Sequence, residues 1–505
     1  MARGGVLYRA AMEQARALAA SRRMFVDGKW VEASNGATYA IPNPATEEPI
    51  GTAPDATVDD MRRAIAAARR AFDGGPWPQT SRQDRARVLN AVADGMERRK
   101  EELRQLLIAE AGATYLTHDI QIEQPIRMMR NYAELALGFD FEEQLPTRVS
   151  ESMLGTQVNS GIVYRHPAGV CGLIPTWNFP LFVTVQKLGP ALATGCTMVF
   201  KPSPYGPLIN LFLAEIVAEA DLPPGVVNFV TGQSNAIAET LVSDPRIDKV
   251  SFTGSVATGR KILEAAAKTL KRVHLELGGK SVAIFLDTDN LDLIAPQAAS
   301  PTFFHAGQGC AMTTRVLVPR EAHDTLVQKM VDFVQGMVKV GDPADPGTFL
   351  GPVIREERRQ KIEEYIESGK REGAVLAHGG GRPKDLRRGY FLEPTIFCAV
   401  PNHIRIAQEE IFGPVVSVIP FADEDEAIRI ANDSTYGLGG MVLTRDTAKA
   451  IALAKRIRTG VVWINNGINF LDAPFGGFKE SGIGREGGRF GMEEYTEMQQ
   501  IVWKA

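Results

Sequence analysis

The sequence predicts an α/β protein that has two parallel-sheet domains in series. From about residue 170, short runs rich in β-branched and aromatic residues alternate with segments of helical periodicity, and the same rhythm resumes after residue 280. This alternation is typical of parallel sheets whose strands are joined by crossover helices. The length of 505 residues also favours two or three domains over one core. In such folds we expect the active site at the carboxyl ends of strands and at a domain junction.

The predicted elements follow in chain order. Residues 24–30 indicate a hairpin that turns at Asp27-Gly28, and Thr57 is a candidate N-cap for the first long helix. Residues 495–503 indicate a strand with no evident partner. Helices are predicted over residues 58–72, 81–108, 121–138, 186–193, 207–220, 235–243 and 258–269, and strands over residues 170–174, 197–200, 226–230, 249–252, 282–285, 315–318, 415–419 and 461–464.

Composition narrows the class of protein. Residues 1–23 hold five arginines and one glutamate, a bias also found in transit peptides, but we expect a plain N-terminal extension. The net charge of −4 gives no reason to expect a nucleic-acid partner, and no apolar run approaches the roughly 18–20 residues that cross a membrane. The four cysteines are scattered and form no CxxC pair, so we expect no disulfide framework, no metal site and a cytoplasmic location.

Cys310 is the candidate nucleophile. It ends a stretch, residues 303–310, in which Gly307 and Gly309 permit unusual backbone angles and could let a ligand approach closely. A thiolate is a strong nucleophile once its pKa is lowered or a base takes the thiol proton. Taken alone, a free cysteine is more often a small buried apolar residue, so other groups must decide between the two interpretations.

Further candidate groups follow the predicted strands, and each also has an ordinary structural interpretation. Asn178, in Pro-Thr-Trp-Asn-Phe-Pro, could donate to an oxyanion or only form a turn. Lys201 could bind ribose hydroxyls or a phosphate, or be a surface lysine. Residues 252–259 could hold a pyrophosphate at a helix N-terminus, although they lack GxGxxG, or form a simple turn from strand to helix.

Carboxylates accompany two other glycine-bearing segments. Glu276 lies in an apolar segment before two glycines, where desolvation would raise its pKa and suit it to general base catalysis. The alternative is a structural ion pair, for example with Lys280. Glu410 belongs to a second carboxylate pair before an apolar turn. Residues 474–486 are dense in glycine and could close over a site or merely connect elements.

In this order and at this spacing, the segments resemble those of the NAD(P)-dependent aldehyde dehydrogenase superfamily, from about residue 24 to the end of the chain. The resemblance implies that Cys310 attacks the aldehyde and that Asn178, with the cysteine's own N–H, stabilises the oxyanion. Hydride transfer to the nicotinamide would leave a thioester. Glu276 matches the base that activates the hydrolytic water, which implies the hydrolytic, non-acylating branch. Lys187 and Glu486 match a pair that relays the proton outward.

The resemblance also implies a cofactor site. Glu410 matches the residue that holds the nicotinamide ribose, Lys201 matches the contact to the adenosine ribose, and residues 254–259 match the pyrophosphate turn. The full set of implied cofactor contacts is Ile174, Pro175, Trp177, Lys201, Ser203, Gly232, Phe252, Thr253, Gly254, Ser255, Gly259, Leu277, Gly278, Glu410 and Phe412.

Three positions depart from the family pattern. Pro204 stands where many NAD-preferring members carry a glutamate that binds the adenosine ribose and repels a 2′-phosphate, so we expect NADP to be tolerated or preferred over NAD. His305 replaces a common asparagine, and we assign it no catalytic role. Thr176 replaces a common proline before Trp-Asn, which could aim Asn178 differently.

The family fold implies a division of the chain that spacing alone does not. A Rossmann-like cofactor domain would comprise residues 24–146 and 165–276, and a catalytic domain residues 277–473. A small β oligomerisation extension would comprise residues 147–164, with a hairpin resembling Glu151 to Tyr164, together with the tail at 474–505. This extension implies a homodimer or homotetramer.

The leading functional hypothesis is therefore an enzyme that oxidises a small-molecule aldehyde to its acid with NAD or NADP. A semialdehyde dehydrogenase of amino-acid or sugar catabolism is the alternative enzyme, but residues 465–472 carry no cation for an anionic tail. A non-catalytic cofactor-binding homologue is disfavoured because both Cys310 and Glu276 are present. Phe179, Phe182, Phe470 and Phe475 could line an apolar entrance or belong to the core.

Overall fold

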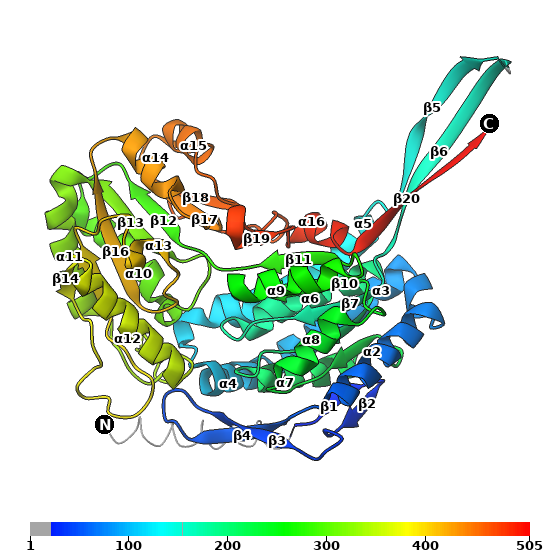
Figure 1. Ribbon diagram of the computed structural model, residues 1–505, viewed down its shortest axis with the longest axis horizontal. Helices are drawn as coiled ribbons and strands as arrows, with labels where there is room; N and C mark the ends of the chain where they lie inside the picture. The colour runs from blue at the N-terminus through cyan, green and yellow to red at the C-terminus, as the bar shows by residue number, and fades with distance from the viewer. Residues whose placement is uncertain (1–21, 154, 505) are drawn as a thin grey trace.

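The computed structural model describes residues 22–153 and 155–504. Two sheet-containing bodies lie side by side, and a narrow three-stranded sheet projects from one of them (Figure 1). The larger sheet has the strand order β19-β11-β10-β7-β8-β9-β1-β2, and the second has the order β14-β15-β16-β13-β12-β17-β18. The α/β class predicted from the sequence is confirmed, and both large sheets are mainly parallel with antiparallel strands at their edges.

Five parallel strands form the centre of the first sheet, and both of its faces are buried. In β8, Met198 and Phe200 pack into one apolar cluster while Val199 packs into the other. Successive side chains of a strand point to opposite faces, so a strand buried on both sides is apolar throughout. The five strands are β7 (Val170–Ile174), β8 (Thr197–Phe200), β9 (Val227–Phe229), β10 (Lys249–Thr253) and β11 (Arg272–Glu276), and their pairing is parallel throughout.

Helices cover both faces of this sheet. One face carries α2 (Val58–Asp73), α8 (Asn235–Ser243) and α9 (Val256–Ala267), and the other carries α3 (Arg82–Arg98), α4 (Lys100–Ala111), α5 (Gln124–Gly138), α6 (Pro180–Thr194) and α7 (Pro207–Ala218). The sheet is completed by β1 (Met24–Val26), β2 (Lys29–Val31) and β19 (Gly482–Ile483), while β3 (Thr38–Pro42) and β4 (Pro49–Pro54) pair separately.

Three local predictions can be compared directly with the structure. Thr57 caps α2 in a capping box with Asp60, and the hairpin turns at Asp27-Gly28, as predicted. The single helix predicted over residues 81–108 is wrong, because the chain breaks between α3 and α4 at Arg99, whose ψ of 19° is not helical. The helix predicted from residue 121 starts as a wider π-helical turn, Asp119–Glu123, before α5.

The second sheet has its own apolar core. Its strands are β12 (Ser281–Phe285), β13 (Thr313–Pro319), β14 (Val375–His378), β15 (Thr395–Cys398), β16 (Val415–Phe421), β17 (Gly439–Leu443) and β18 (Val461–Ile464), with only β14 antiparallel at one edge. Its helices are α10 (Leu291–Phe303), α11 (His323–Met337), α12 (Glu356–Arg371), α13 (Arg405–Gln408), α14 (Glu424–Asn432) and α15 (Thr447–Ala454). The short helix α16 (Gly488–Glu493) lies against α5 and α6.

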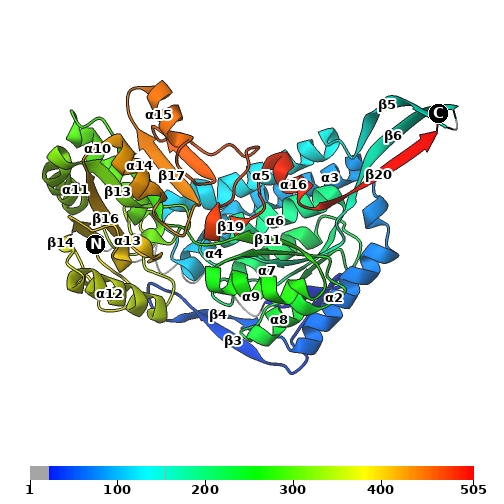
Figure 2. The same ribbon diagram turned by 45° about the horizontal axis from the view of Figure 1, so that its top comes forward.

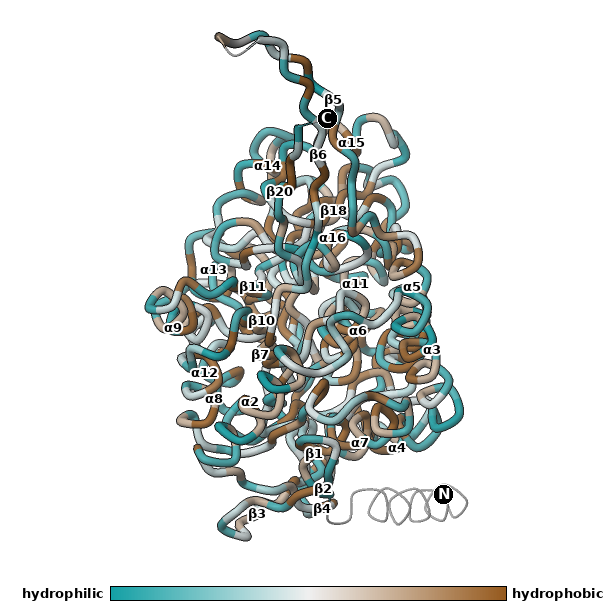
Figure 3. The backbone as a smooth tube through the Cα atoms, turned by 90° about the vertical axis from the view of Figure 1, so that its right-hand side faces the viewer, coloured by the Kyte–Doolittle hydropathy of each residue, from teal (hydrophilic) through white to brown (hydrophobic). Residues whose placement is uncertain are grey.

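The projecting sheet consists of β5 (Glu142–Ser152), β6 (Gly155–Pro167) and the C-terminal β20 (Thr496–Lys504), and it extends away from the body in both ribbon views (Figures 1 and 2). The strand expected near the C-terminus therefore finds its partner in β6. Apolar and polar residues both occur along this extension (Figure 3), and Met498, Val502 and Trp503 are exposed on it.

The expected segment limits differ from the observed strands in two places. β5 begins at Glu142, five residues before the limit at 147, and the segment at 474–505 also supplies β19 to the first sheet. The N-terminal extension proposed for residues 1–23 lies outside the described residues, apart from its last two positions. No helix among the described residues is both long and apolar enough to cross a membrane.

Candidate active site

The polar candidates gather at one edge of the first sheet. Asn178 follows β7, Lys201 follows β8, Gly254 follows β10, and Glu276 ends β11. These strands are parallel and in register, with Thr253 paired to Glu276, so their carboxyl ends lie side by side. The fold therefore brings together groups that are almost one hundred residues apart in the sequence.

The loop that carries Cys310 reverses sharply after α10. His305, Ala306 and Gly307 all have positive φ, at 47°, 54° and 71°. A Cβ on Gly307 would lie 2.1 Å from the Gly413 carbonyl oxygen, and one on Gly309 would lie 2.6 Å from Met312 Cε. The unusual backbone angle expected from glycine is observed at Gly307. Protein atoms occupy the space beside both glycines, which therefore allow close packing of the loop.

Asn178 contacts this loop through both its side chain and its backbone. Its Nδ2 donates to the Gln308 carbonyl oxygen at 2.7 Å. Its own carbonyl oxygen lies 2.8 Å from His305 Nε2 and accepts from Gln121 Nε2 at 3.0 Å. Desolvation lowers the pKa of His305 to about 4, so the neutral ring can donate here. His305 and Gln121 fix the position of Asn178, a role that the sequence did not indicate for Gln121.

Cys310 lies against the glycines that follow Glu276. A Cβ added to Gly279 would lie 2.2 Å from the Cys310 carbonyl oxygen, so only glycine allows these two segments to meet. The residue is half-buried. Desolvation, reinforced by the carboxylates of Glu410 and Glu276, raises the pKa of the Cys310 thiol to about 12. The thiol is therefore protonated at neutral pH and needs a proton acceptor to become a nucleophile.

Glu276 is buried beneath the glycine-dense segment 474–486. Desolvation, and then the charge of Glu486, raises its pKa well above the usual range. A Cβ on Gly476 would lie 2.8 Å from Glu276 Oε1, and β19 pairs directly with β11. The segment thus closes over Glu276 rather than merely connecting elements. No ion pair joins Glu276 to Lys280 within the described residues, so that structural alternative is not supported.

Lys187 and Glu486 form an ion pair behind Glu276. Their Nζ and Oε1 atoms are 2.7 Å apart, and both side chains are almost fully buried. Lys187 Nζ also donates to Ser251 Oγ at 3.0 Å. Because burying a charge without an opposite charge is costly, loss of either side chain would leave the other charge unpaired in the interior and destabilise the fold.

The adenosine end of the expected cofactor site is formed by β8, β10 and α9. Lys201 is buried, and desolvation lowers its pKa to about 8 although the Asp55 carboxylate opposes the shift. Ser255 caps α9, accepting from the Thr258 N–H at 3.3 Å. The side-chain oxygen of Thr253 is buried without a hydrogen bond among the described residues. A buried cation and an exposed helix N-terminus fit a dinucleotide phosphate and ribose.

The nicotinamide end of the expected site contains Glu410 and Phe412. Glu410 Oε1 accepts from the Gly279 N–H at 2.9 Å, and a Cβ on Gly278 would lie 2.4 Å from Glu410 Oε2. Phe412 has a φ of 57°, and its ring packs edge-on against Trp177 with 5.4 Å between ring centroids. The remaining predicted contacts are buried around this edge: Ile174, Pro175, Gly232, Phe252, Gly259 and Leu277. Ser203 is half-buried, with its Oγ accepting from the Tyr205 N–H.

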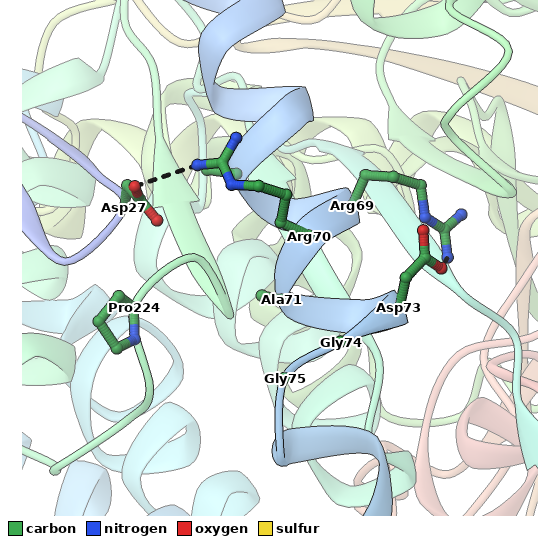
Figure 4. A pocket seen from close by; sticks show the side chains of 9 residues that line it. Asp27, Arg69, Arg70, Ala71, Asp73, Gly74, Gly75 and Pro224 are labelled. Atoms are coloured by element: carbon green, nitrogen blue, oxygen red, sulfur yellow. Dashed lines mark hydrogen bonds and ion pairs between the residues drawn. The ribbon is translucent and has the colours of Figure 1, made fainter.

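A separate surface pocket of about 600 Å³ lies far from this edge, between the end of α2 and the turn before β9 (Figure 4). Its wall includes Asp27, Pro224 and Arg70, and the Arg70 guanidinium lies 3.2 Å from the Asp27 carboxylate. Pro224 precedes β9, so this pocket is at the amino end of the strand. Catalytic groups of parallel sheets lie at the opposite edge, so we assign the pocket no part in catalysis.

A mainly parallel sheet covered on both faces, with the candidate cofactor contacts gathered beside a cysteine, is the arrangement of an NAD(P)-dependent oxidoreductase. The chain belongs to the aldehyde dehydrogenase family, whose model matches residues 30–501. The resemblance inferred from the sequence is thus confirmed at the level of the family and of its enzymatic activity. No group of three or more potential metal ligands occurs among the described residues.

Several characterised proteins are similar over almost the whole chain. A chloroplastic aminoaldehyde dehydrogenase of Arabidopsis thaliana is 40% identical over 486 residues, covering 95% of this chain and 96% of its own. A 3-succinoylsemialdehyde-pyridine dehydrogenase of a Pseudomonas species is 40% identical, covering 95% and 98%. The crystal structure of Staphylococcus aureus betaine aldehyde dehydrogenase in complex with NAD+ superposes with a TM-score of 0.93 at 38% identity, covering 97% of each chain.

Proposed function

We propose that Cys310, Asn178 and Glu276 carry out aldehyde oxidation in this protein. The observation that carries the proposal is their convergence, because Asn178 donates to the Cys310 loop and the Glu276 segment packs on the Cys310 backbone. The Cys310 thiol would release its proton to solvent water as the sulfur bonds to the aldehyde carbon, and the oxygen that gains charge would be held by Asn178 Nδ2 and the Cys310 N–H. Loss of hydride from that carbon would leave a thioester on Cys310.

Glu276 would act in the second half of the reaction. A carboxyl whose pKa is raised by burial can accept a proton near neutral pH, so it can deprotonate a water that attacks the thioester. The carbon–sulfur bond then breaks, releasing the acid and restoring the thiol. The buried Lys187–Glu486 pair supports a role for these residues in passing the water's proton outward.

We propose that the nicotinamide of NAD or NADP lies against Glu410 and Phe412, where it would supply the hydride acceptor. Lys201 and the N-terminus of α9 would hold the adenosine ribose and the pyrophosphate. The structure of the Staphylococcus aureus relative contains NAD+. Pro204, beside half-buried Ser203, offers no carboxylate that would repel a 2′-phosphate, which supports use of NADP as well. A ratio of kcat/KM for NAD over NADP above about 100, roughly 2.7 kcal/mol, would contradict this proposal.

For the substrate, we propose an aldehyde without an anionic tail. The ring of Phe179 lies 5.1 Å from that of His305, on the Cys310 loop, which supports an apolar wall beside the nucleophile. Phe470 is 75% exposed and Phe475 is half-buried, whereas Phe182 packs on the core. Two relatives are named as aminoaldehyde dehydrogenase and betaine aldehyde dehydrogenase, and neither name specifies an aldehyde with an anionic tail. The semialdehyde alternative keeps support from the Pseudomonas relative.

The test is a panel of aldehydes with aliphatic, aromatic, amino-substituted and carboxylate-bearing groups, run with both cofactors. Product is followed as the absorbance band of the reduced nicotinamide. We expect turnover that Cys310→Ala abolishes. Full activity in that variant would contradict the proposed nucleophile, and highest kcat/KM for the carboxylate-bearing group would select the semialdehyde alternative.

We further propose that the chain forms a homodimer or homotetramer through the projecting sheet. Its support is the set of exposed apolar residues on β20, namely Met498, Ile501, Val502 and Trp503. A cytoplasmic location is proposed on the four free cysteines. Light scattering would test the oligomer, and a monomeric mass would contradict it. Cell fractionation would test the location, and recovery of the protein from an oxidising compartment would contradict it.

A further inference from the structure

His274 lies between Glu276 and the buried Lys187–Glu486 pair, although the sequence assigned it no role. It sits two residues before Glu276 on β11, so both side chains point to the same face of the sheet. His274 Nε2 is 3.5 Å from Glu276 Oε1, and His274 Nδ1 is 3.5 Å from Glu486 Oε1. All three side chains are almost fully buried.

The polar atoms that face one another here lack other partners. Both carboxyl oxygens of Glu276 and the Nε2 of His274 are buried without a hydrogen bond among the described residues. No lysine, arginine or other histidine nitrogen in that part of the chain lies within 4.0 Å of Glu276. A buried carboxylate without a hydrogen-bond donor is costly. When Glu276 is ionised, it is therefore favourable for its Oε1 to approach His274 Nε2, now 3.5 Å away, and to form a hydrogen bond.

The hydrogen bonds of Ser251 favour the tautomer of His274 that carries its hydrogen on Nε2. Lys187 Nζ can only donate, so Ser251 Oγ accepts from it at 3.0 Å. The Ser251 hydroxyl can then donate to His274 Nδ1, which is 3.1 Å away. Ser251 and His274 are paired across β10 and β11, which fixes this contact. A neutral ring that accepts at Nδ1 carries its hydrogen on Nε2, the atom that faces Glu276.

Other neighbours keep the ring neutral and in place. Desolvation, together with the cations of Lys187, Lys249 and Arg485, lowers the pKa of His274 well below its usual value. These cations come from α6, from β10 and from the covering loop, and the hydroxyl of Tyr495 also lies near Ser251. A Cβ on Gly484 would lie 2.5 Å from the ring Cδ2, so the loop backbone leaves the imidazole little freedom to turn.

We propose that His274 is a positioning residue that donates its Nε2–H to the Glu276 carboxylate and so holds that base ready to deprotonate the hydrolytic water. The inference rests on the proposed role of Glu276 and adds the group that orients it. Donation to the charged form of a carboxyl favours that form. His274 therefore sets the pH at which deacylation of Cys310 begins, without touching the substrate.

The experiment follows deacylation separately from hydride transfer. p-Nitrophenyl acetate acylates a thiol without a cofactor, so its steady hydrolysis reports the step that needs Glu276, while the first turnover of aldehyde with NAD reports the earlier steps. His274→Leu keeps the side-chain bulk but removes the donor. In this variant we expect the pH midpoint of the deacylation rate to rise by about one unit, and the deacylation rate at pH 7 to fall about tenfold. The burst of reduced nicotinamide in the first turnover should be retained.

His274→Gln and His274→Asn are matched controls. The longer glutamine amide reaches the position of Nε2, so it should restore the wild-type pH midpoint, whereas asparagine reaches only as far as Nδ1 and should resemble leucine. If the leucine variant does not fold, the glutamine and asparagine variants still test the prediction. An unmoved midpoint in folded His274→Leu, or restoration by asparagine instead of glutamine, would overturn the inference. Wild-type deacylation by Glu276→Gln would instead contradict the proposed function itself.

Discussion

Substitution of Asn178 by alanine isolates the proposed oxyanion donor with little other disturbance. The change removes Nδ2, which now donates to the Gln308 carbonyl at 2.7 Å. The contacts from His305 and Gln121 reach the backbone oxygen of Asn178, so they survive the substitution. The strand end and the Cys310 loop should therefore keep their positions, and the change tests chemistry rather than folding.

The expected loss follows from the value of one preorganised donor. Removing such a group costs about 2.7–4 kcal/mol of transition-state stabilisation, or about 10²–10³ in rate. The assay is kcat/KM for aldehyde oxidation at saturating cofactor, with the first turnover followed by stopped flow. We expect kcat and kcat/KM to fall together, because the bond strengthens only in the transition state.

Asn228 provides the matched control. It is equally buried, and its Nδ2 donates to the carbonyls of Met198 at 3.0 Å and Gly225 at 2.8 Å, far from Cys310. Asn228→Ala should lose about 1–3 kcal/mol of stability but keep its kcat. The reasoning is refuted if folded Asn178→Ala retains activity within about threefold of the wild type, or if only its KM changes.

Four further outcomes are expected. Glu486→Gln leaves the Lys187 ammonium buried without its partner and should lower the free energy of unfolding by about 3–5 kcal/mol in urea titrations; a loss below about 1 kcal/mol would contradict the buried pair. Pro204→Glu should lower kcat/KM with NADP at least about tenfold relative to NAD, and equal effects on both cofactors would argue against charge repulsion. Burial raises the pKa of Glu110 to about 7, so its ionised form destabilises the fold. Relative to Glu110→Gln, the free energy of unfolding of the wild type should fall by up to about 3 kcal/mol as the pH rises from about 5 to 8. Parallel plots of unfolding free energy against pH for the two proteins would refute this. Deleting residues 496–505 should reduce the mass measured by light scattering to that of a smaller assembly, and an unchanged mass would exclude the projecting sheet as the interface.

The sequence predicted the parts of the fold that depend on local pattern. Apolar runs identified the parallel strands β7, β8 and β10, and the residues that follow them identified Asn178, Lys201 and Gly254 as neighbours, because parallel strands share a carboxyl edge. The strand β11, which ends in Glu276, was not among the predicted strands. It did not predict the break at Arg99, where helical residues continue on both sides and only the non-helical backbone of Arg99 separates α3 from α4.

Long-range contacts were the main limit of sequence reasoning. Gly307 and Gly309 were correctly singled out, but their neighbours, Gly413 and Met312, could not be known without the fold. Gln121 and His274 were passed over because their contacts join residues that are distant in sequence: Gln121 binds the Asn178 backbone, and His274 lies between Ser251 and Glu486. Period-two spacing from Glu276 was the one available signal that His274 shares its face.

Mass spectrometry of acid-quenched Glu276→Gln tests the central account most directly. This variant should form the thioester but not hydrolyse it, so aldehyde and NAD should yield one acyl group per chain and one equivalent of reduced nicotinamide. Proteolysis should locate the acyl group on Cys310, while Cys171, Cys196 and Cys398 remain as internal controls. An acyl group on another cysteine, or continued turnover without any adduct, would contradict the account.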